Sequence, residues 1–156
     1  MSFWLRCVMT ESEGPQQLLQ GINHAAFAAA DLDATVEFYA DVFGLMPTEL
    51  ATDADAERNV FLFFPNGTFL HIIASPECPT GVPTAREVPG NLIYEDAALD
   101  HVALFANDTT ALQVIHERLA ARGAADSAVV ETGGVVQTLR FRDPDGRLLE
   151  VSAYVS

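Results

Sequence analysis

Three histidines and one glutamate occupy matching places in two halves of the chain: His24, His71, His101 and Glu150. The stretch "PNGTFLHIIA" at residues 65–74 and the stretch "PDGRLLEVSA" at residues 144–153 share one register, in which His71 corresponds to Glu150. Imidazole nitrogens with a carboxylate suit Fe(II), Mn(II), Ni(II), Co(II) or Zn(II), and they do not suit calcium, which prefers oxygen ligands. The four residues therefore predict a site for a divalent transition metal.

The two halves repeat one another over most of residues 21–156. The segment "INHAAFAAADLDATVEFYADVFGL" aligns with "LDHVALFANDTTALQVIHERLAARGA", because His24 falls on His101 at a shift of 101 − 24 = 77. The later segments align at a shift of 150 − 71 = 79, so the copies differ by a two-residue insertion. A repeat of this kind predicts two copies of one supersecondary unit, whose pairing about a pseudo-twofold axis would bring the four side chains together.

Each copy has the pattern of a strand, a helix and further strands. The first segment of each copy is short and apolar, which is typical of a buried strand. Asp31 and Asp108 stand where a helix N-cap is expected, and Gly44 and Gly123 suit the helix ends. A tight turn, "PNG" or "PDG", separates the last two strands of each copy. The predicted unit is β-α-β-β-β, with strands at residues 22–28, 60–64 and 68–74 in copy one and at 99–106, 135–142 and 148–154 in copy two.

The strands after each helix separate a core face from a variable face, because strand side chains alternate. One set of alternate residues is mostly apolar in both copies, and we expect it to face the helices. The other set pairs Phe61 and Phe63 with Arg140 and Arg142, the divergence expected of a ligand-facing surface. We predict that these four residues contact substrate, with an arginine at an anionic or enolate-like oxygen. In the alternative, the arginines extend along an exposed edge.

The bulk composition limits the classes of partner. The 156 residues suit one domain, and a net charge of −14 with eight Lys and Arg disfavours nucleic acid. No apolar run approaches the roughly 18 residues of a membrane span, and two cysteines with no secretion signal favour a reduced, cytoplasmic setting. The expected organisation is a flexible leader (1–20) and one domain (21–156), divided into module one (21–74), a linker (75–97) and module two (98–156).

The chain resembles the vicinal oxygen chelate superfamily, which includes glyoxalases, extradiol dioxygenases, epimerases, fosfomycin-resistance transferases and bleomycin-resistance proteins. The motifs that carry the resemblance are "INHAAFAAADLDATVEFYADVFGL", "LDHVALF" and "FRDPDGRLLEVSA". The resemblance implies an α+β fold in which paired βαβββ modules form a cup-shaped mixed sheet with the helices on the convex side. It also implies a homodimer, and a metal on the concave face with ligands matching His24, His101 and Glu150. His71 occupies a place that is commonly Glu or Gln in glyoxalase- and epimerase-like members.

The resemblance implies an enzyme whose metal binds two neighbouring oxygens of a small substrate as a Lewis acid. Two His and one carboxylate leave room for a catechol and O₂ on Fe(II), with His71 acting as base, so we favour an extradiol-type ring-cleaving dioxygenase. His71 and Glu150 are then catalytic, although "TLRFRD" lacks the tyrosine usual in those enzymes. A permanent fourth ligand at His71 would instead favour a glyoxalase- or epimerase-like lyase or isomerase. A metal-free drug-binding protein is the third alternative.

Overall fold

The computed structural model describes residues 18–19, 21–48, 58–78 and 101–155 in full, and the backbone of residues 85–88 and 91–94. Almost all of the expected leader, and much of the expected linker, lie outside the described residues. The linker also contains a two-stranded hairpin, β5 (Ala85–Val88) with β6 (Asn91–Tyr94), which the sequence did not predict.

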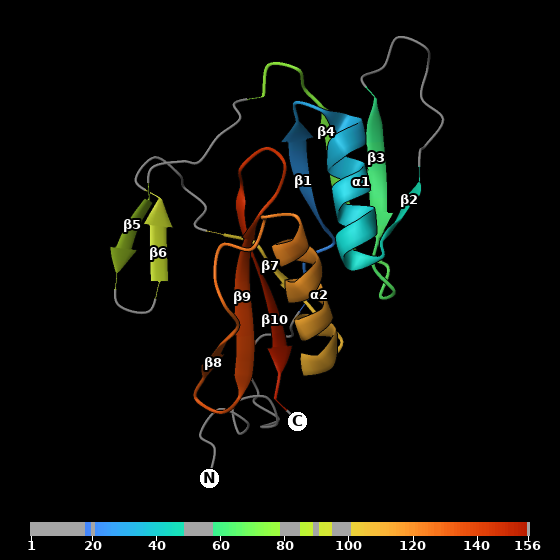
Figure 1. The fold of residues 1–156 in the computed structure, drawn as a ribbon. Coiled ribbons are helices and arrows are strands. Elements are labelled where there is room, and N and C mark those ends of the chain that lie inside the picture. Colours follow the sequence, from blue (N-terminus) through green and yellow to red (C-terminus); the bar gives the residue numbers. More distant parts are fainter. Residues whose placement is uncertain are drawn as a thin grey trace.

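Two modules of the same topology make up the rest of the molecule (Figure 1). Each module has a four-stranded mixed sheet, ordered β1-β4-β3-β2 in the first and β7-β10-β9-β8 in the second. Module one consists of β1 (His24–Ala29), α1 (Leu32–Phe43), β2 (Met46–Thr48), β3 (Asn59–Phe63) and β4 (Phe69–Ala74). Module two consists of β7 (Ala103–Phe105), α2 (Thr109–Ala121), β8 (Val130–Thr132), β9 (Val136–Arg142) and β10 (Leu148–Tyr154). The predicted paired βαβββ modules are confirmed.

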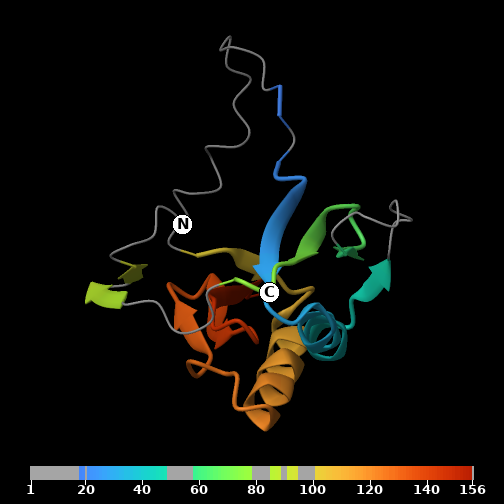
Figure 2. The ribbon, with the colours of Figure 1, turned by 90° about the horizontal axis from the view of Figure 1, so that it is seen from above.

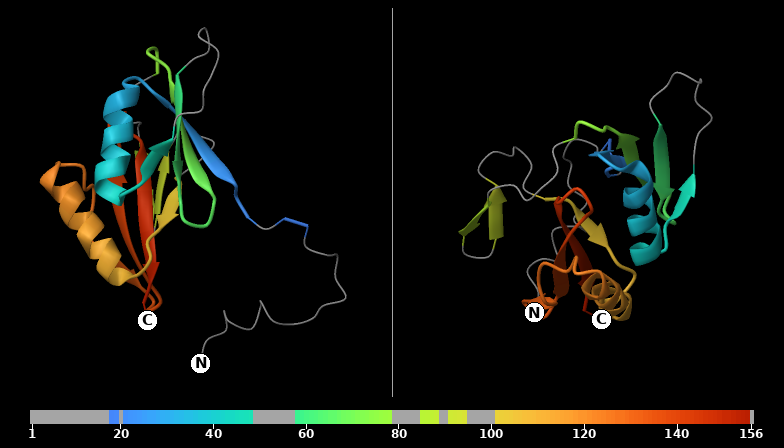
Figure 3. Two further views of the ribbon diagram at one scale, coloured as in Figure 1. Left: turned by 90° about the vertical axis from the view of Figure 1, so that its right-hand side faces the viewer. Right: turned by 45° about the horizontal axis from the view of Figure 1, so that its top comes forward.

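Both helices lie on the same side of the strands, as the left view of Figure 3 shows. Seen from above, β1 stands between the other strands of its sheet and module two (Figure 2). The inward-facing side chains of both sheets join the two helices in one core, which includes Leu62, Ile72, Phe141 and Val151. The opposite faces of the sheets carry no helix among the described residues, and these are the concave faces on which the four candidate ligands were expected.

The helix ends follow the residues that the sequence singled out. The side chain of Asp31 accepts a hydrogen bond from the Ala34 amide, and Asp108 accepts one from the Ala111 amide, so both are N-caps. Gly44 ends α1 with φ at 72°, a left-handed conformation that costs glycine little. These local signals fix where each helix begins and ends relative to the strand before it.

Strand pairing reproduces the duplication residue by residue. In module one Ala26 of β1 lies opposite His71 of β4, and in module two Ala103 of β7 lies opposite Glu150 of β10. The two pairs are related by 103 − 26 = 77 and 150 − 71 = 79, the shifts found in the sequence. His71 and Glu150 therefore occupy equivalent positions in their modules.

His101 departs from the symmetry between the modules. β1 begins at His24, which lies opposite Phe69, whereas β7 begins at Ala103, two residues after His101. Within the described residues, the strand predicted at 99–106 is observed only as Ala103–Phe105. His24 is thus fixed in a sheet, and His101 precedes one.

No helix among the described residues is long and apolar enough to cross a lipid bilayer.

Candidate functional site

His24 and His71 lie together on the concave face of module one. Their ring centroids are 6.4 Å apart, with an edge-on interplanar angle of 65°. They come from neighbouring parallel strands, β1 and β4, and each has the parity that faces away from the buried Leu70 and Ile72. Two of the four predicted ligands are therefore brought together by one pair of strands.

A phenylalanine stacks on each of these imidazoles. Phe69 lies 4.8 Å from His24 with an interplanar angle of 5°, and Phe61 lies 4.4 Å from His71 with an angle of 12°. Phe63 completes the cluster through contacts with Phe61 and Phe69. Stacking at these distances fixes ring orientation, so the two histidines are held in place by an aromatic surface.

The Nε2 atom of His71 is buried and has no hydrogen-bond partner among the described residues. A buried polar atom without a partner is uncommon in a folded protein and calls for an explanation, such as an ion or ligand. Burial, together with the proximity of His24, lowers the pKa of His71 from its ordinary value of 6.5. The neutral imidazole that this favours is the form that binds a metal or accepts a proton.

Glu150 lies on the concave face of module two beside an arginine. It is opposite Arg140 in the β9–β10 ladder, and the Arg140 Nε atom is 3.7 Å from the Glu150 Oε2 atom. Both side chains are half-buried. A half-buried carboxylate is costly without a cationic partner, and Arg140 supplies one within the strand pair.

The two arginines predicted to contact substrate differ in their surroundings. Arg142 donates from Nε to Asp126 at 2.9 Å and from Nη1 to the Gly146 carbonyl at 3.1 Å. These contacts tie Arg142 to loops of its own module. Arg140 instead lies next to Glu150, so of the two arginines it is the one placed beside a candidate ligand.

The chain does not bring all four candidate ligands to one point. Within the part of the chain that the structure describes, no three His, Cys, Asp or Glu residues are close enough to hold one ion. His24 and His71 lie close together in module one, whereas Glu150 and the half-buried His101 belong to module two. Each chain thus carries one half of the predicted set on each module.

A cavity of about 380 Å³ lies between the edge strands of the two sheets. Its lining includes His24 and Phe69 from module one and Ala103 and Phe105 from module two. β1 and β7 are the outer strands of their sheets, so this cavity marks where module one meets module two on the ligand side.

Phe69 is the site residue that sequence reasoning missed. The sequence placed it in the strand predicted at residues 68–74 but gave it no role. Its parity, which is the same as that of His71, was the available signal. Which ring would stack on which imidazole depends on the pairing of β1 with β4, which the sequence alone does not give.

Comparison with known proteins agrees with this architecture. Residues 21–151 match the family described as the Glyoxalase/Bleomycin resistance protein/Dioxygenase superfamily. The chain is 30% identical over 138 residues to the metallothiol transferase FosB of Shouchella clausii (strain KSM-K16), covering 86% of this chain and 80% of FosB.

Solved structures resemble it as well. A glyoxylase/bleomycin resistance protein/dioxygenase domain from Frankia sp. EAN1pec has a TM-score of 0.68 and 25% identity, over 88% of this chain and 94% of that one. A FosX variant from Listeria monocytogenes, complexed with Mn(II) and 1S,2S-dihydroxypropylphosphonic acid, has a TM-score of 0.59 and 17% identity, over 87% and 94% of the chains. The chain belongs to the glyoxalase/bleomycin resistance protein/dioxygenase superfamily.

Proposed function

We propose that this protein is an enzyme that uses a divalent metal ion to bind a small substrate through two neighbouring oxygen atoms. His24, His71, His101 and Glu150 would hold the metal. The observation that carries the proposal is the buried, unpartnered Nε2 atom of His71 beside His24. When bound, the metal would act as a Lewis acid that polarises the substrate oxygens.

The donor atoms fit such a metal. Three imidazoles and one carboxylate match the ligand preferences of Fe, Mn, Co, Ni and Zn. The lowered pKa of His71 keeps its imidazole neutral at neutral pH, as a ligand must be. Binding would compete with the contact between Arg140 and Glu150, whose 3.7 Å separation is longer than a strong ion pair.

The complete site, in this proposal, is shared between two copies of the chain. One copy contributes His24 and His71, and its partner contributes the residues equivalent to His101 and Glu150. Two observations support this: no three candidate ligands meet within the described part of one chain, and large apolar side chains are exposed near β1 and β7. Ile22 is 82% exposed and Phe105 is 60% exposed. Exposed apolar surface of this kind is typical of an interface.

The protein residues around the metal define the substrate. Phe61, Phe63 and Phe69 form an apolar wall that suits a flat or hydrophobic part of the molecule. Arg140 would meet a negatively charged oxygen on the other wall, once the carboxylate of Glu150 is engaged elsewhere. If His71 were not a metal ligand, its neutral imidazole would accept a proton from the substrate.

Lewis-acid chemistry without O₂, as in a lyase, isomerase or transferase, is the first candidate reaction. Four protein ligands, with His71 kept in the set, leave fewer positions for O₂ together with a chelating substrate. Similarity to a metallothiol transferase supports this choice. An extradiol-type ring-cleaving dioxygenase is the second candidate, because the aromatic wall suits a catechol.

Metal analysis of protein purified without oxygen, followed by assays, tests the proposal. We expect about one divalent metal per chain. Ring cleavage of catechols with stoichiometric iron would support the second candidate, and thiol addition or isomerisation with Mn, Ni, Co or Zn would support the first. Protein that holds no metal after reconstitution would overturn the proposal and favour the drug-binding alternative, in which the acidic chain sequesters a cationic molecule.

A further inference from the structure

The turn between β9 and β10, residues 143–147, reaches from module two into module one. Arg147 lies at its end, with Nη1 2.7 Å from Asp143 Oδ2 and 2.9 Å from Asp145 Oδ2. The same guanidinium donates to the backbone carbonyl of Ala28 at the end of β1, and it lies 5.5 Å from the ring centroid of Phe27. The turn therefore contacts the strand that carries His24.

Both carboxylates of the turn accept hydrogen bonds from α1 or from the residues just before it. Asp145 accepts hydrogen bonds from the Ala30 amide at 2.9 Å and from the Thr35 hydroxyl at 3.4 Å. Asp143 accepts one from the Tyr39 hydroxyl at 3.3 Å. We call this set of contacts, made by residues 143–147 with β1 and α1, the inter-module latch.

The latch sets two buried carboxylates against the one guanidinium of Arg147, and neutral donors supply further hydrogen bonds to the carboxylates. Asp143 and Asp145 are only 5% and 4% exposed. Burial and the neighbouring Asp143 raise the pKa of Tyr39, so its hydroxyl remains a donor. Burial lowers the pKa of Arg147, but the two carboxylates outweigh it and raise that pKa overall. Buried charges of this kind tolerate little displacement, because separating them leaves uncompensated charge in the protein interior.

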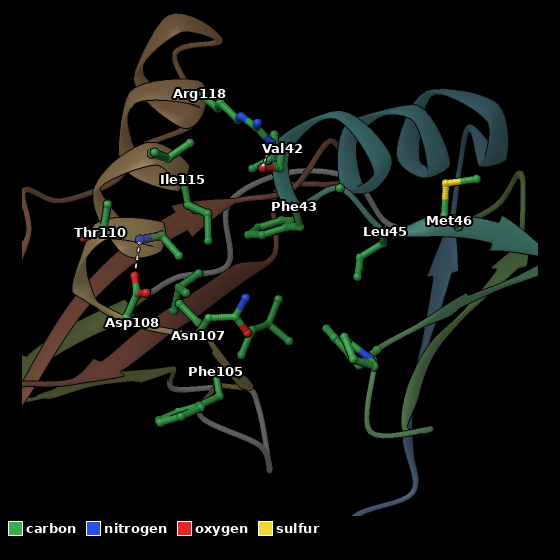
Figure 4. A pocket seen from close by; sticks show the side chains of 18 of the residues that line it. Val42, Phe43, Leu45, Met46, Phe105, Asn107, Asp108, Thr110, Ile115 and Arg118 are labelled. Atoms are coloured by element: carbon green, nitrogen blue, oxygen red, sulfur yellow. Dashed lines mark hydrogen bonds between the residues drawn. The ribbon is translucent and has the colours of Figure 1, made fainter. Parts of the chain in front are cut away.

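The equivalent place in the other module is built differently. The shift of 79 relates Asp145 to Asn66 and Arg147 to Thr68, and Asn66 accepts hydrogen bonds from Thr68 within its own turn. A cavity of about 710 Å³ adjoins this first-module turn, and in Figure 4 Phe43 and Leu45 face Asn107 and Ile115 across it. The two modules are therefore joined by the inter-module latch on one side of their junction, and a cavity separates them on the other side.

Other hydrogen bonds and ion pairs between the modules lie at the helix ends. Arg118 of α2 donates to the carbonyls of Asp41 and Val42, and Arg122 pairs with Asp41 at 2.8 Å. The Arg122–Asp41 pair is largely exposed, and exposed ion pairs contribute little free energy of folding. The latch is the polar contact that is both buried and adjacent to ligand-bearing strands.

We propose that the inter-module latch is a positioning element that sets the separation between the ligand group of module one and that of module two. Along the chain, Ala28 follows His24 within β1, and Arg147 immediately precedes β10, which carries Glu150. The latch thus joins the two ligand-bearing strands directly. In a twofold dimer each chain offers both of its groups at once, so their separation in one chain must match the separation in its partner.

This inference rests on the proposed function, so its test measures geometry and metal affinity separately. Spin labels are placed at Thr48→Cys in β2 and Thr132→Cys in β8, both exposed on the outer strands of the two sheets. Cys7→Ser and Cys78→Ser are present in every chain compared, the reference included, because the Cys78 Sγ atom itself contacts Arg147 and the Ala28 carbonyl. Labelled chain is diluted with unlabelled chain, and the distance distribution is recorded without metal. Zn(II) affinity is measured by calorimetry on unlabelled protein.

The main variant is Asp145→Ala, which removes the contacts with Ala30 and Thr35 and leaves Asp143 to pair with Arg147. We expect a broader or shifted distance distribution and a Zn(II) Kd raised roughly tenfold, the lower end of the range for groups that hold ligands in place. Asp145→Asn keeps an acceptor for the Ala30 amide and should show a smaller change in both. Asp145→Asn also provides the test if Asp145→Ala does not fold.

Asn66→Ala at the equivalent turn is the matched control and should change neither measurement. Unchanged distances in the folded Asp145 variants, or wild-type Zn(II) affinity in them, would overturn the inference. The same would follow if Asn66→Ala had effects as large as those of Asp145→Ala. A wild-type chain that binds no divalent metal would instead overturn the proposed function, and the positioning role with it.

Discussion

At the scale of single residues, the chemistry that we propose for the site depends on the neutral imidazole of His71. Its pKa lies below 6.5 because the ring is partly buried and His24 is near. The unfolded chain binds a proton at the ordinary pKa, so protonation at low pH favours unfolding. His71 should therefore add pH dependence to stability below about pH 6.5, with full stability above it.

The substitution His71→Gln tests this residue-scale expectation. Wild-type Tm should fall more between pH 7.5 and pH 5 than that of the variant, because the variant lacks the group that must be protonated. Melting followed by circular dichroism in the absence of metal gives both slopes. An equal fall in Tm in the two proteins over this pH range would contradict a lowered pKa for His71.

The stacked phenylalanines provide a second residue-scale prediction. Phe61→Leu removes the ring that stacks on His71, and an aromatic pair of this kind contributes about 0.5–1.5 kcal/mol. We expect Zn(II) affinity to fall by roughly 2–10-fold, measured by calorimetry. Phe63→Leu is the matched control, since the contacts found for Phe63 are with other phenylalanines. Equal losses of affinity in the two variants would contradict a specific stacking role.

At the scale of elements, β4 carries core residues on one face and site residues on the other, because successive side chains of a strand alternate. Leu70 and Ile72 point into the core at 2% and 0% exposure, while Phe69, His71 and Ile73 lie on the other face and are half-buried. A strand of six residues therefore serves both folding and chemistry. The register with β1 and β3 fixes which aromatic rings stand beside His71.

Neighbouring alanine substitutions in β4 should separate the two faces. Ile72→Ala leaves a cavity in the core and should lower the free energy of unfolding by about 2–5 kcal/mol. Ile73→Ala should cost well under half as much, because that side chain already contacts solvent. Urea denaturation of metal-free protein measures both. Similar losses at the two positions would argue against the assigned parity.

Local signals made much of each element predictable from sequence. β10 spans the predicted residues 148–154, and the caps Asp31 and Asp108 stand where the helices begin, because capping and strand alternation depend on neighbouring residues. The inter-module latch was not predicted. "DPDG" indicated only a turn, and its partners Ala30 and Tyr39 lie more than a hundred residues away in sequence.

At the scale of the whole molecule, the duplication predicted the two modules but not how far apart their ligands lie. The four residues occupy the expected elements, except that His101 precedes β7. Their convergence depends on how modules pack, and the packing is set by long-range contacts such as those of Arg147. One chain carries half of the predicted set on each module, and in our proposal a second copy completes the site.

Mixed dimers test the sharing of the site between chains. His24→Ala and Glu150→Gln chains are co-expressed with different tags, and dimers that carry both tags are isolated. If the site is shared, one of the two sites in each mixed dimer keeps all its ligands, so metal content should be about half that of wild type. Each variant alone is the control and should hold little metal. Mixed dimers that are no better than either parent would show that each site lies within one chain.

The central claim is that one divalent metal is held jointly by ligands from both modules. Its most direct test is calorimetric titration of metal-free protein with Zn(II), compared across His24→Ala, His71→Ala, His101→Ala and Glu150→Gln. The account predicts one strong site per chain in wild type and at least roughly tenfold weaker binding in every variant, whichever module it alters. Wild-type affinity that persists in both module-two variants, or no Zn(II) binding by wild type, would contradict it.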